Sequence, residues 1–226
     1  MRRRLAGAAL VAILTAAVVR LSPAQTATGR VDAVVSDDRG KPVADAVVSV
    51  TSPVAPPAAP PAAPAVMDQQ NKEFVPHVLT VAVGTPVAFP NRDNIRHHVY
   101  SFSSAKRFEL PLYIGTPAAP VVFDRPGVVV LGCNIHDWMV GYVYVAGTPY
   151  FAKTGLDGRA RVGALPPGTY EARVWHPRMK GDPEKTSQPI AVTAGEPDHL
   201  TFVVGLKPEQ RAPRRPDGPT YDRPQS

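Results

Sequence analysis

Apolar and polar positions alternate in short stretches along most of the chain. Residues 31–36 and 46–51 are two such valine-rich stretches, and the turn sequence of residues 37–40 joins them. The same alternation continues through residues 66–145 and 148–206, with many β-branched residues and frequent turns that contain Gly or Pro. Beyond the N-terminal segment, no stretch sustains apolar residues at helical spacing. The pattern predicts an all-β fold made of sandwiches.

Three segments depart from this alternation. Residues 53–65 are nearly all Pro and Ala, cannot pair in a sheet, and are predicted to form a polyproline-like linker. Residues 207–226 are rich in Pro, Arg and Asp, hold almost no large apolar residue, and are predicted to be disordered. Residues 103–116 are ambiguous, and we expect either a short helix or an irregular loop there.

The N-terminus has the layout of a secretory signal peptide. A triple-arginine start precedes the apolar run of residues 5–19, which is short for a membrane span and ends at Arg20. A small-residue cleavage site precedes Gln25, so residues 1–24 are predicted to be removed on export to the periplasm. The alternative is an uncleaved anchor, because Arg20 is unusual so near a cleavage site. The mature chain is expected to have no membrane span.

Cleavage at this site changes the charge of the protein. The signal peptide holds four arginines and no acidic residue, so 25 basic residues become 21 against 19 acidic ones, and the formal charge falls from +6 to +2. No basic patch typical of nucleic-acid binding remains, and no nucleic-acid partner is expected. The single cysteine excludes an internal disulfide. A lone thiol in an oxidising compartment is expected to be buried or bound to a metal.

That cysteine belongs to a cluster of possible metal ligands. Cys133, His136 and Met139 follow the spacing C-x2-H-x2-M between two expected strands, and His97 and His98 lie upstream. Two imidazoles, one thiolate and a weak axial thioether are the ligand set of a blue-copper electron-transfer site. Zinc fits less well because it prefers further Cys or His ligands and rarely takes Met. A buried Cys with incidental His and Met neighbours is the structural alternative.

Several other residues have more than one interpretation. Strand side chains alternate between faces, so only one of His97 and His98 can face the metal. His77 is expected to be an ordinary strand or surface residue, and His176 and His199 to be structural or solvated. Trp138 could either fill the loop or mark a surface for partner docking.

The central third of the chain resembles the cupredoxins, the family of plastocyanin, azurin and amicyanin. Residues 84–91 match the family's strand entry followed by Asn, and His97 comes next. The other three ligands lie on one loop, between expected strands at 128–131 and 141–145. The resemblance implies a Greek-key sandwich, one type 1 copper held by His97, Cys133, His136 and Met139, and a one-electron carrier rather than an enzyme.

The resemblance also suggests partners. The two-residue gap between His136 and Met139 is similar to the short amicyanin loop, and some plastocyanin-like bacterial proteins carry a methylamine-utilisation label. A cytochrome c or a dehydrogenase-like protein is therefore the expected redox partner. Two rival functions are a copper carrier or chaperone, and a scaffold whose metal site is vestigial. In the family the residue after the first His is an Asn that braces the thiolate loop, a position held here by His98.

The flanking segments resemble the carboxypeptidase-regulatory-like sandwich, a small immunoglobulin- or prealbumin-like fold. The likeness rests on residues 29–31 and 42–48 at one end, and on residues 153–160 and 165–174 at the other. Two strands alone are marginal in water, so the two ends are expected to form one sandwich with the copper domain inserted. The expected divisions are signal peptide 1–24, first half of the sandwich 29–52, linker 53–65, cupredoxin domain 66–147, second half 148–206 and tail 207–226.

Overall fold

The described part of the chain is built almost entirely of β-strands. The computed structural model describes residues 27–53, 63–117 and 119–208. In these ranges seventeen strands are accompanied by one short 3-10 helix, Pro183–Thr186. The prediction of an all-β fold is therefore confirmed. The signal peptide, most of the linker and nearly all of the tail lie outside the described residues. Within the described ranges, no helix has the length and apolar character needed to cross a membrane.

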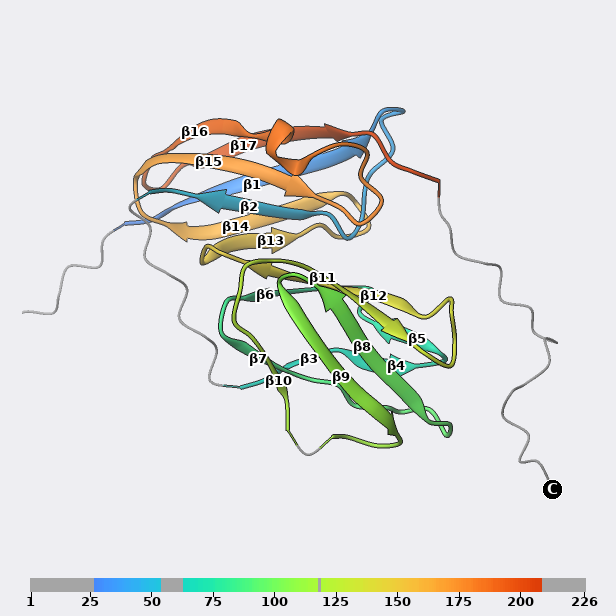
Figure 1. The fold of residues 1–226 in the computed structure, drawn as a ribbon. Helices are drawn as coiled ribbons and strands as arrows, with labels where there is room; N and C mark the ends of the chain where they lie inside the picture. Colours follow the sequence, from blue (N-terminus) through green and yellow to red (C-terminus); the bar gives the residue numbers. More distant parts are fainter. Residues whose placement is uncertain (1–26, 54–62, 118, 209–226) are drawn as a thin grey trace, which may run out of the picture.

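The two ends of the chain pack into one sandwich, drawn at the top of Figure 1. Each sheet joins an early strand to late ones: β1 runs antiparallel to β14 and parallel to β17, while β2 lies between β13 and β15. We call this unit the terminal sandwich. Its strands are β1 (Gly29–Asp37), β2 (Val47–Thr51), β13 (Tyr150–Lys153), β14 (Arg159–Leu165), β15 (Gly168–Trp175), β16 (Gln188–Val192) and β17 (Pro197–Val204).

The alternation of buried and exposed side chains explains why these strands form a sandwich. Along β1, Val31, Ala33 and Val35 are buried while the residues between them are more exposed, which is the period-2 pattern of a strand with one face in a core. These side chains join Phe202 of β17 and Val174 of β15 in one apolar cluster.

The middle of the chain forms a second unit, the central sandwich. A five-stranded sheet in the order β6-β12-β11-β8-β9 faces a three-stranded sheet in the order β10-β7-β3, and β4 pairs with β5 beside them. The strands are β3 (Ala65–Val66), β4 (Asp68–Gln70), β5 (Glu73–Val75), β6 (Val78–Ala82), β7 (Thr85–Ala88), β8 (His97–Ser103), β9 (Lys106–Tyr113), β10 (Val121–Phe123), β11 (Gly127–Cys133) and β12 (Val140–Ala146). Phe89, Phe123 and Leu131 are among its fully buried side chains.

The ambiguous segment is a strand, so the expectation of a helix or irregular loop at 103–116 is wrong. β9 pairs antiparallel with β8 through most of its length and forms an edge of the five-stranded sheet. Its partly buried residues, such as Phe108 and Leu110, alternate with exposed ones. The exposed positions include Pro111 and Leu112, which break the simple polar alternation by which a strand is recognised in sequence.

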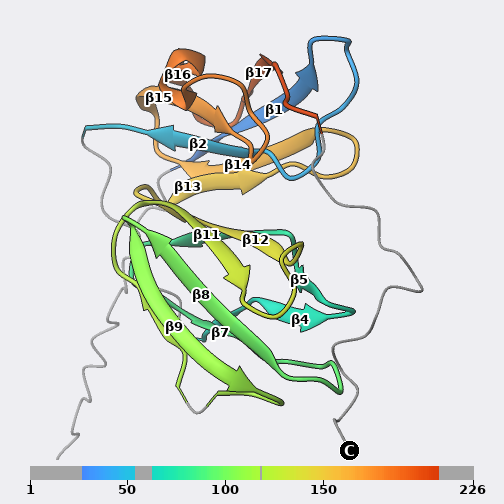
Figure 2. The ribbon, with the colours of Figure 1, turned by 45° about the vertical axis from the view of Figure 1, so that its right-hand side comes forward.

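The two sandwiches meet below β13 in Figure 2, and aromatic side chains lie in contact across their boundary. The ring of Trp175, at the end of β15, lies 6.0 Å from that of Tyr142 and 5.4 Å from that of Tyr144, both on β12. Lys153 crosses the same boundary: its Nζ donates to Asp45 Oδ1 at 2.6 Å within the terminal sandwich and to the Val78 backbone oxygen at 2.9 Å in the central one. Side chains of both units therefore hold them together.

Removal of the Trp175 ring tests how much this contact contributes. We expect Trp175→Ala to lower the free energy of unfolding by about 2 kcal/mol, because a large half-buried ring loses two aromatic partners. Urea unfolding followed by circular dichroism measures the change. Leu156→Ala is the control, since Leu156 is 93% exposed; it should change stability by less than about 0.5 kcal/mol. Equal effects of the two substitutions would contradict a stabilising contact.

The buried His176 should make stability depend on pH. Burial, reinforced by the nearby Arg178 charge, lowers the pKa of His176 from 6.5 to about 4, so at pH 5 the unfolded chain binds a proton there that the folded chain does not. Stability is then fully present above pH 6.5 and falls as pH drops toward 4, with a loss of about 2 kcal/mol at pH 5. Urea unfolding of the metal-free protein at pH 7.5 and 5 should show this loss in wild type and lack it in His176→Gln. An identical pH dependence in both would rule the effect out.

Candidate metal centre

Cys133 enters the core because of strand alternation. In β11 the side chains of Val129, Leu131 and Cys133 are buried on one face, while Val130 is exposed on the other. Cys133 is the last residue of that strand. The strand alternation that buries Val129 and Leu131 therefore also places the Cys133 thiol in the core, at one end of the sandwich.

His97 reaches the same end from the neighbouring strand. β8 is antiparallel to β11, with Val99 opposite Cys133 and Tyr100 opposite Gly132. His97 begins β8 and is fully buried. His98 points to the opposite face, where its Nε2 lies 2.9 Å from Glu109 Oε1. Of the two candidate histidines, His97 is the one on the same side of the sheet as Cys133. His98 acts through its backbone, which hydrogen-bonds to Cys133.

A tight loop between β11 and β12 brings His136 back beside Cys133. The Met139 N–H donates to the His136 carbonyl at 2.9 Å, and the Val140 N–H donates to the Trp138 carbonyl at 3.0 Å. These short-range bonds turn the chain within a few residues. As a result His136, although it lies on a loop, is only 4% exposed.

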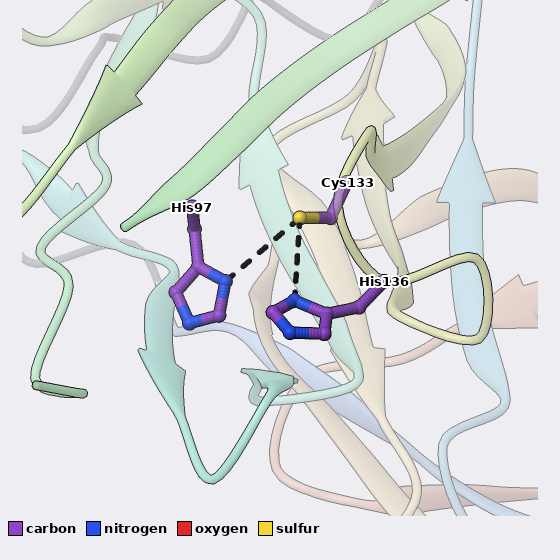
Figure 3. Close-up of side chains that lie close together, drawn as sticks. All are labelled: His97, Cys133 and His136. Carbon is purple, nitrogen blue, oxygen red and sulfur yellow. Dashed lines mark hydrogen bonds between the residues drawn. The ribbon is translucent and has the colours of Figure 1, made fainter. Parts of the chain in front are cut away.

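Three donor atoms face one another at this end of the sandwich (Figure 3). Cys133 Sγ lies 3.8 Å from Nδ1 of His97 and 3.8 Å from Nδ1 of His136. Potential donor atoms of the three residues lie within 4.8 Å of one another. Metal–sulfur and metal–nitrogen bonds of about 2.3 and 2.0 Å at a trigonal angle would separate the donors by about 3.7 Å. The two nitrogen–sulfur separations therefore fit a shared metal ion.

Met139 completes the set predicted from sequence. It is buried and belongs to the same apolar cluster as Cys133, together with Phe89 and Val99. The thioether is a soft donor and favours copper over zinc, whose structural sites use Cys, His and carboxylates. His97, Cys133, His136 and Met139 thus gather at one end of the sandwich, in a set consistent with a type 1 copper site.

The protein environment favours the thiolate of Cys133. Burial alone would raise the pKa of this thiol, but a hydrogen bond with His97 and bonds with the backbone of His98, Ile135 and His136 hold it below its ordinary value. The thiolate is the form of cysteine that binds metals. The loop and the start of β8 therefore favour the form of Cys133 that can bind a metal.

One residue of the site has no role in the sequence-based ligand set. Asp93 Oδ2 lies 2.8 Å from His97 Nε2, the ring nitrogen that faces away from Cys133. The four-residue spacing from Asp93 to His97 was visible in the sequence, but it indicates a contact only once the intervening turn is known.

The remaining histidines lie elsewhere, and Trp138 lies at the site. His77 packs edge-on against Tyr142, 5.3 Å between ring centres, and neither it, His176 nor His199 belongs to the donor cluster. The Trp138 ring lies 5.2 Å from the His136 ring and is 47% exposed. Trp138 therefore both covers His136 and presents apolar surface.

Comparison with known proteins identifies similar solved structures for part of the chain. A purple cupredoxin from Nitrosopumilus maritimus is 27% identical over 36% of this chain and 96% of its own, with a TM-score of 0.32. A reduced and an oxidised structure of two amicyanin mutants are each 25% identical over 43% of this chain and 99% of their own, with TM-scores of 0.34. No protein-family model matches the sequence, and no curated protein matches it.

The packing behind the loop is tight at Gly141. A Cβ added there would lie 2.7 Å from Phe74 Cβ, an atom close to the backbone of a buried side chain. We expect Gly141→Ala to destabilise the protein by about 1–3 kcal/mol through overpacking. Gly163→Ala is the matched control, because a Cβ at that strand position meets nothing within 4 Å. Thermal unfolding of both variants measures the difference, and equal melting temperatures would refute the tight contact.

Proposed function

We propose that this protein is an exported type 1 copper protein that carries single electrons between redox partners. The observation that carries the proposal is the set of three buried donor atoms, His97 Nδ1, Cys133 Sγ and His136 Nδ1, at separations that suit one metal ion. Met139 is proposed as the weak axial ligand. Among biological metals, copper is the one that suits two imidazoles, a thiolate and a thioether.

A copper ion held there would supply a one-electron Cu(II)/Cu(I) couple. The protein's own part is to fix the donors. Cys133 and His97 belong to hydrogen-bonded strands, and His136 and Met139 to a loop closed by its own backbone bonds. Because these groups are buried and held before metal arrives, water is excluded and little rearrangement accompanies a change of charge. Such a site is suited to electron transfer rather than to substrate chemistry.

We propose His136 and its apolar surroundings as the place where electrons leave and enter. The ring is only 4% exposed, and Ile135 and Trp138 beside it are 37% and 47% exposed. Exposed aromatic and aliphatic side chains next to a nearly buried ligand make a surface on which a partner can exclude water. A cytochrome c or a dehydrogenase-like protein is the proposed class of partner. The short loop between His136 and Met139 supports a methylamine-utilisation system as the proposed setting.

The N-terminal segment and the terminal sandwich bear on where the protein works and how the copper domain is supported. The signal-peptide sequence supports export to the periplasm, where a buried copper thiolate would be protected from oxidation. The terminal sandwich is proposed to be a carboxypeptidase-regulatory-like module that supports the copper domain, with no chemistry of its own. Neither role involves an enzymatic reaction.

Copper loading of the purified mature protein tests the proposal. We expect Cu(II) to produce a strong visible absorption band, because a thiolate bound to Cu(II) gives charge transfer, and Cys133→Ser to abolish it. Met139→Leu should keep the band and raise the reduction potential, because the axial ligand tunes it. Met67→Leu, a change at a buried Met of the same core, should leave the potential unaltered.

Other results would point to other functions. Binding of Cu(I) without colour would replace the electron carrier with a copper carrier or chaperone. Absence of binding to either ion would leave a scaffold with a vestigial site.

A further inference from the structure

Asp93 occupies a network that links the candidate metal centre to a distant turn. Its Oδ1 accepts from the Asn71 N–H at 2.6 Å, and its Oδ2 accepts from the Lys72 N–H at 2.8 Å. The same Oδ2 lies 2.8 Å from His97 Nε2. The side chain is 13% exposed. One carboxylate thus joins two backbone amides to the imidazole.

The turn is shaped to present those amides. Gln70 pairs with Glu73 across the β4–β5 hairpin, so Asn71 and Lys72 form a two-residue turn. Both have positive φ, 55° and 60°, as a type I′ hairpin turn requires. Asn adopts this conformation readily, whereas it is unusual for Lys. The two successive N–H groups then point to one acceptor, the carboxylate of Asp93.

Asp93 is also fixed from its own side. Its N–H donates to Asn91 Oδ1 at 3.0 Å, and the Asn91 side chain donates to the Ile95 and Tyr113 carbonyls at 2.8 and 2.9 Å. The Arg92 N–H donates to the Gln69 carbonyl at 2.9 Å, which fastens this segment to β4. The carboxylate therefore has little freedom to leave His97.

This arrangement determines which ring nitrogen of His97 carries the hydrogen and which one can bind a metal. A carboxylate that accepts two amide N–H bonds is ionised and can only accept from His97, so Nε2 carries the hydrogen. Nδ1, which lies 3.8 Å from Cys133 Sγ, is then the nitrogen that a metal can take in place of its hydrogen bond with the sulfur. A carboxylate on the far nitrogen also makes an imidazole a stronger donor to a metal.

We propose that Asp93, held by the β4–β5 turn, is a positioning residue that selects the Nδ1-binding tautomer of His97 and stabilises bound Cu(II) over Cu(I). The proposal rests on the copper-binding function inferred above. It makes a turn more than twenty residues upstream of His97 a determinant of copper affinity and reduction potential. The ligand set alone does not imply that dependence.

Asp93→Asn tests the proposal, because the two side chains are nearly the same size and differ in charge. We expect Cu(II) binding, measured by competition with a chelator, to weaken by about 10- to 100-fold, the usual effect of losing such a partner. Cu(I) binding should weaken less. Each tenfold difference between the two losses corresponds to a rise of about 59 mV in reduction potential.

Asp124→Asn is the matched control. Asp124 lies in the same sandwich and pairs with Lys106 at 3.1 Å, outside the donor cluster. It should leave both affinities and the potential as in wild type. Unchanged affinity and potential in Asp93→Asn, or equal shifts in the two variants, would overturn the proposal.

The tautomer can be read without copper and without a variant. In ¹⁵N-edited NMR of metal-free wild type, His97 should carry its hydrogen on Nε2. A hydrogen found on Nδ1 with Nε2 bare would overturn the proposal even if Asp93→Asn fails to fold. If wild type binds no copper, the proposed function fails, whereas the NMR result still decides whether Asp93 sets the tautomer.

Discussion

The structure around the candidate metal centre depends on one constraint, the burial of three polar donors in an apolar core. His97, Cys133 and His136 lie among phenylalanine, valine and leucine side chains, and each would lose hydrogen bonds to water there. Such burial is unfavourable unless every polar atom finds a partner. In the protein the three groups face one another, and His97 has a carboxylate behind it. A bound metal would complete this compensation, which explains why a lone thiol can be retained at this position.

Sheet geometry makes this burial possible with residues that are far apart in sequence. The antiparallel pairing of β8 with β11 sets Val99 opposite Cys133, so that His97 lies just beyond the pair and on the same face. A register shift in the pairing of β8 with β9 falls between His97 and Val99. Irregularities of this kind re-aim side chains at the ends of sheets. The ligand positions are thus set by strand register, which also explains why the neighbouring His98 faces away.

Much of this could be inferred from the sequence, for identifiable physical reasons. The spacing of Cys133, His136 and Met139 is local, so the bond pattern of the loop follows from a few residues. Alternation within β8 favours one of two adjacent histidines. The role of Asp93 was not accessible in the same way, since it depends on two amides of a turn more than twenty residues upstream. β9 was missed because its exposed face carries Pro111 and Leu112 instead of polar side chains. Local patterns were readable, whereas the contact of Asp93 with the β4–β5 turn required the fold.

The terminal sandwich has a physical role that follows from the outer face of the five-stranded sheet. Tyr142 and Tyr144 point out of the central core, and without Trp175 against them β12 would expose two adjacent aromatic rings. Large exposed apolar patches favour association with other proteins. Coverage of this patch leaves the loop side chains Ile135 and Trp138 as exposed apolar groups next to His136. The terminal sandwich thereby removes one aromatic patch from the exposed surface of the central sandwich.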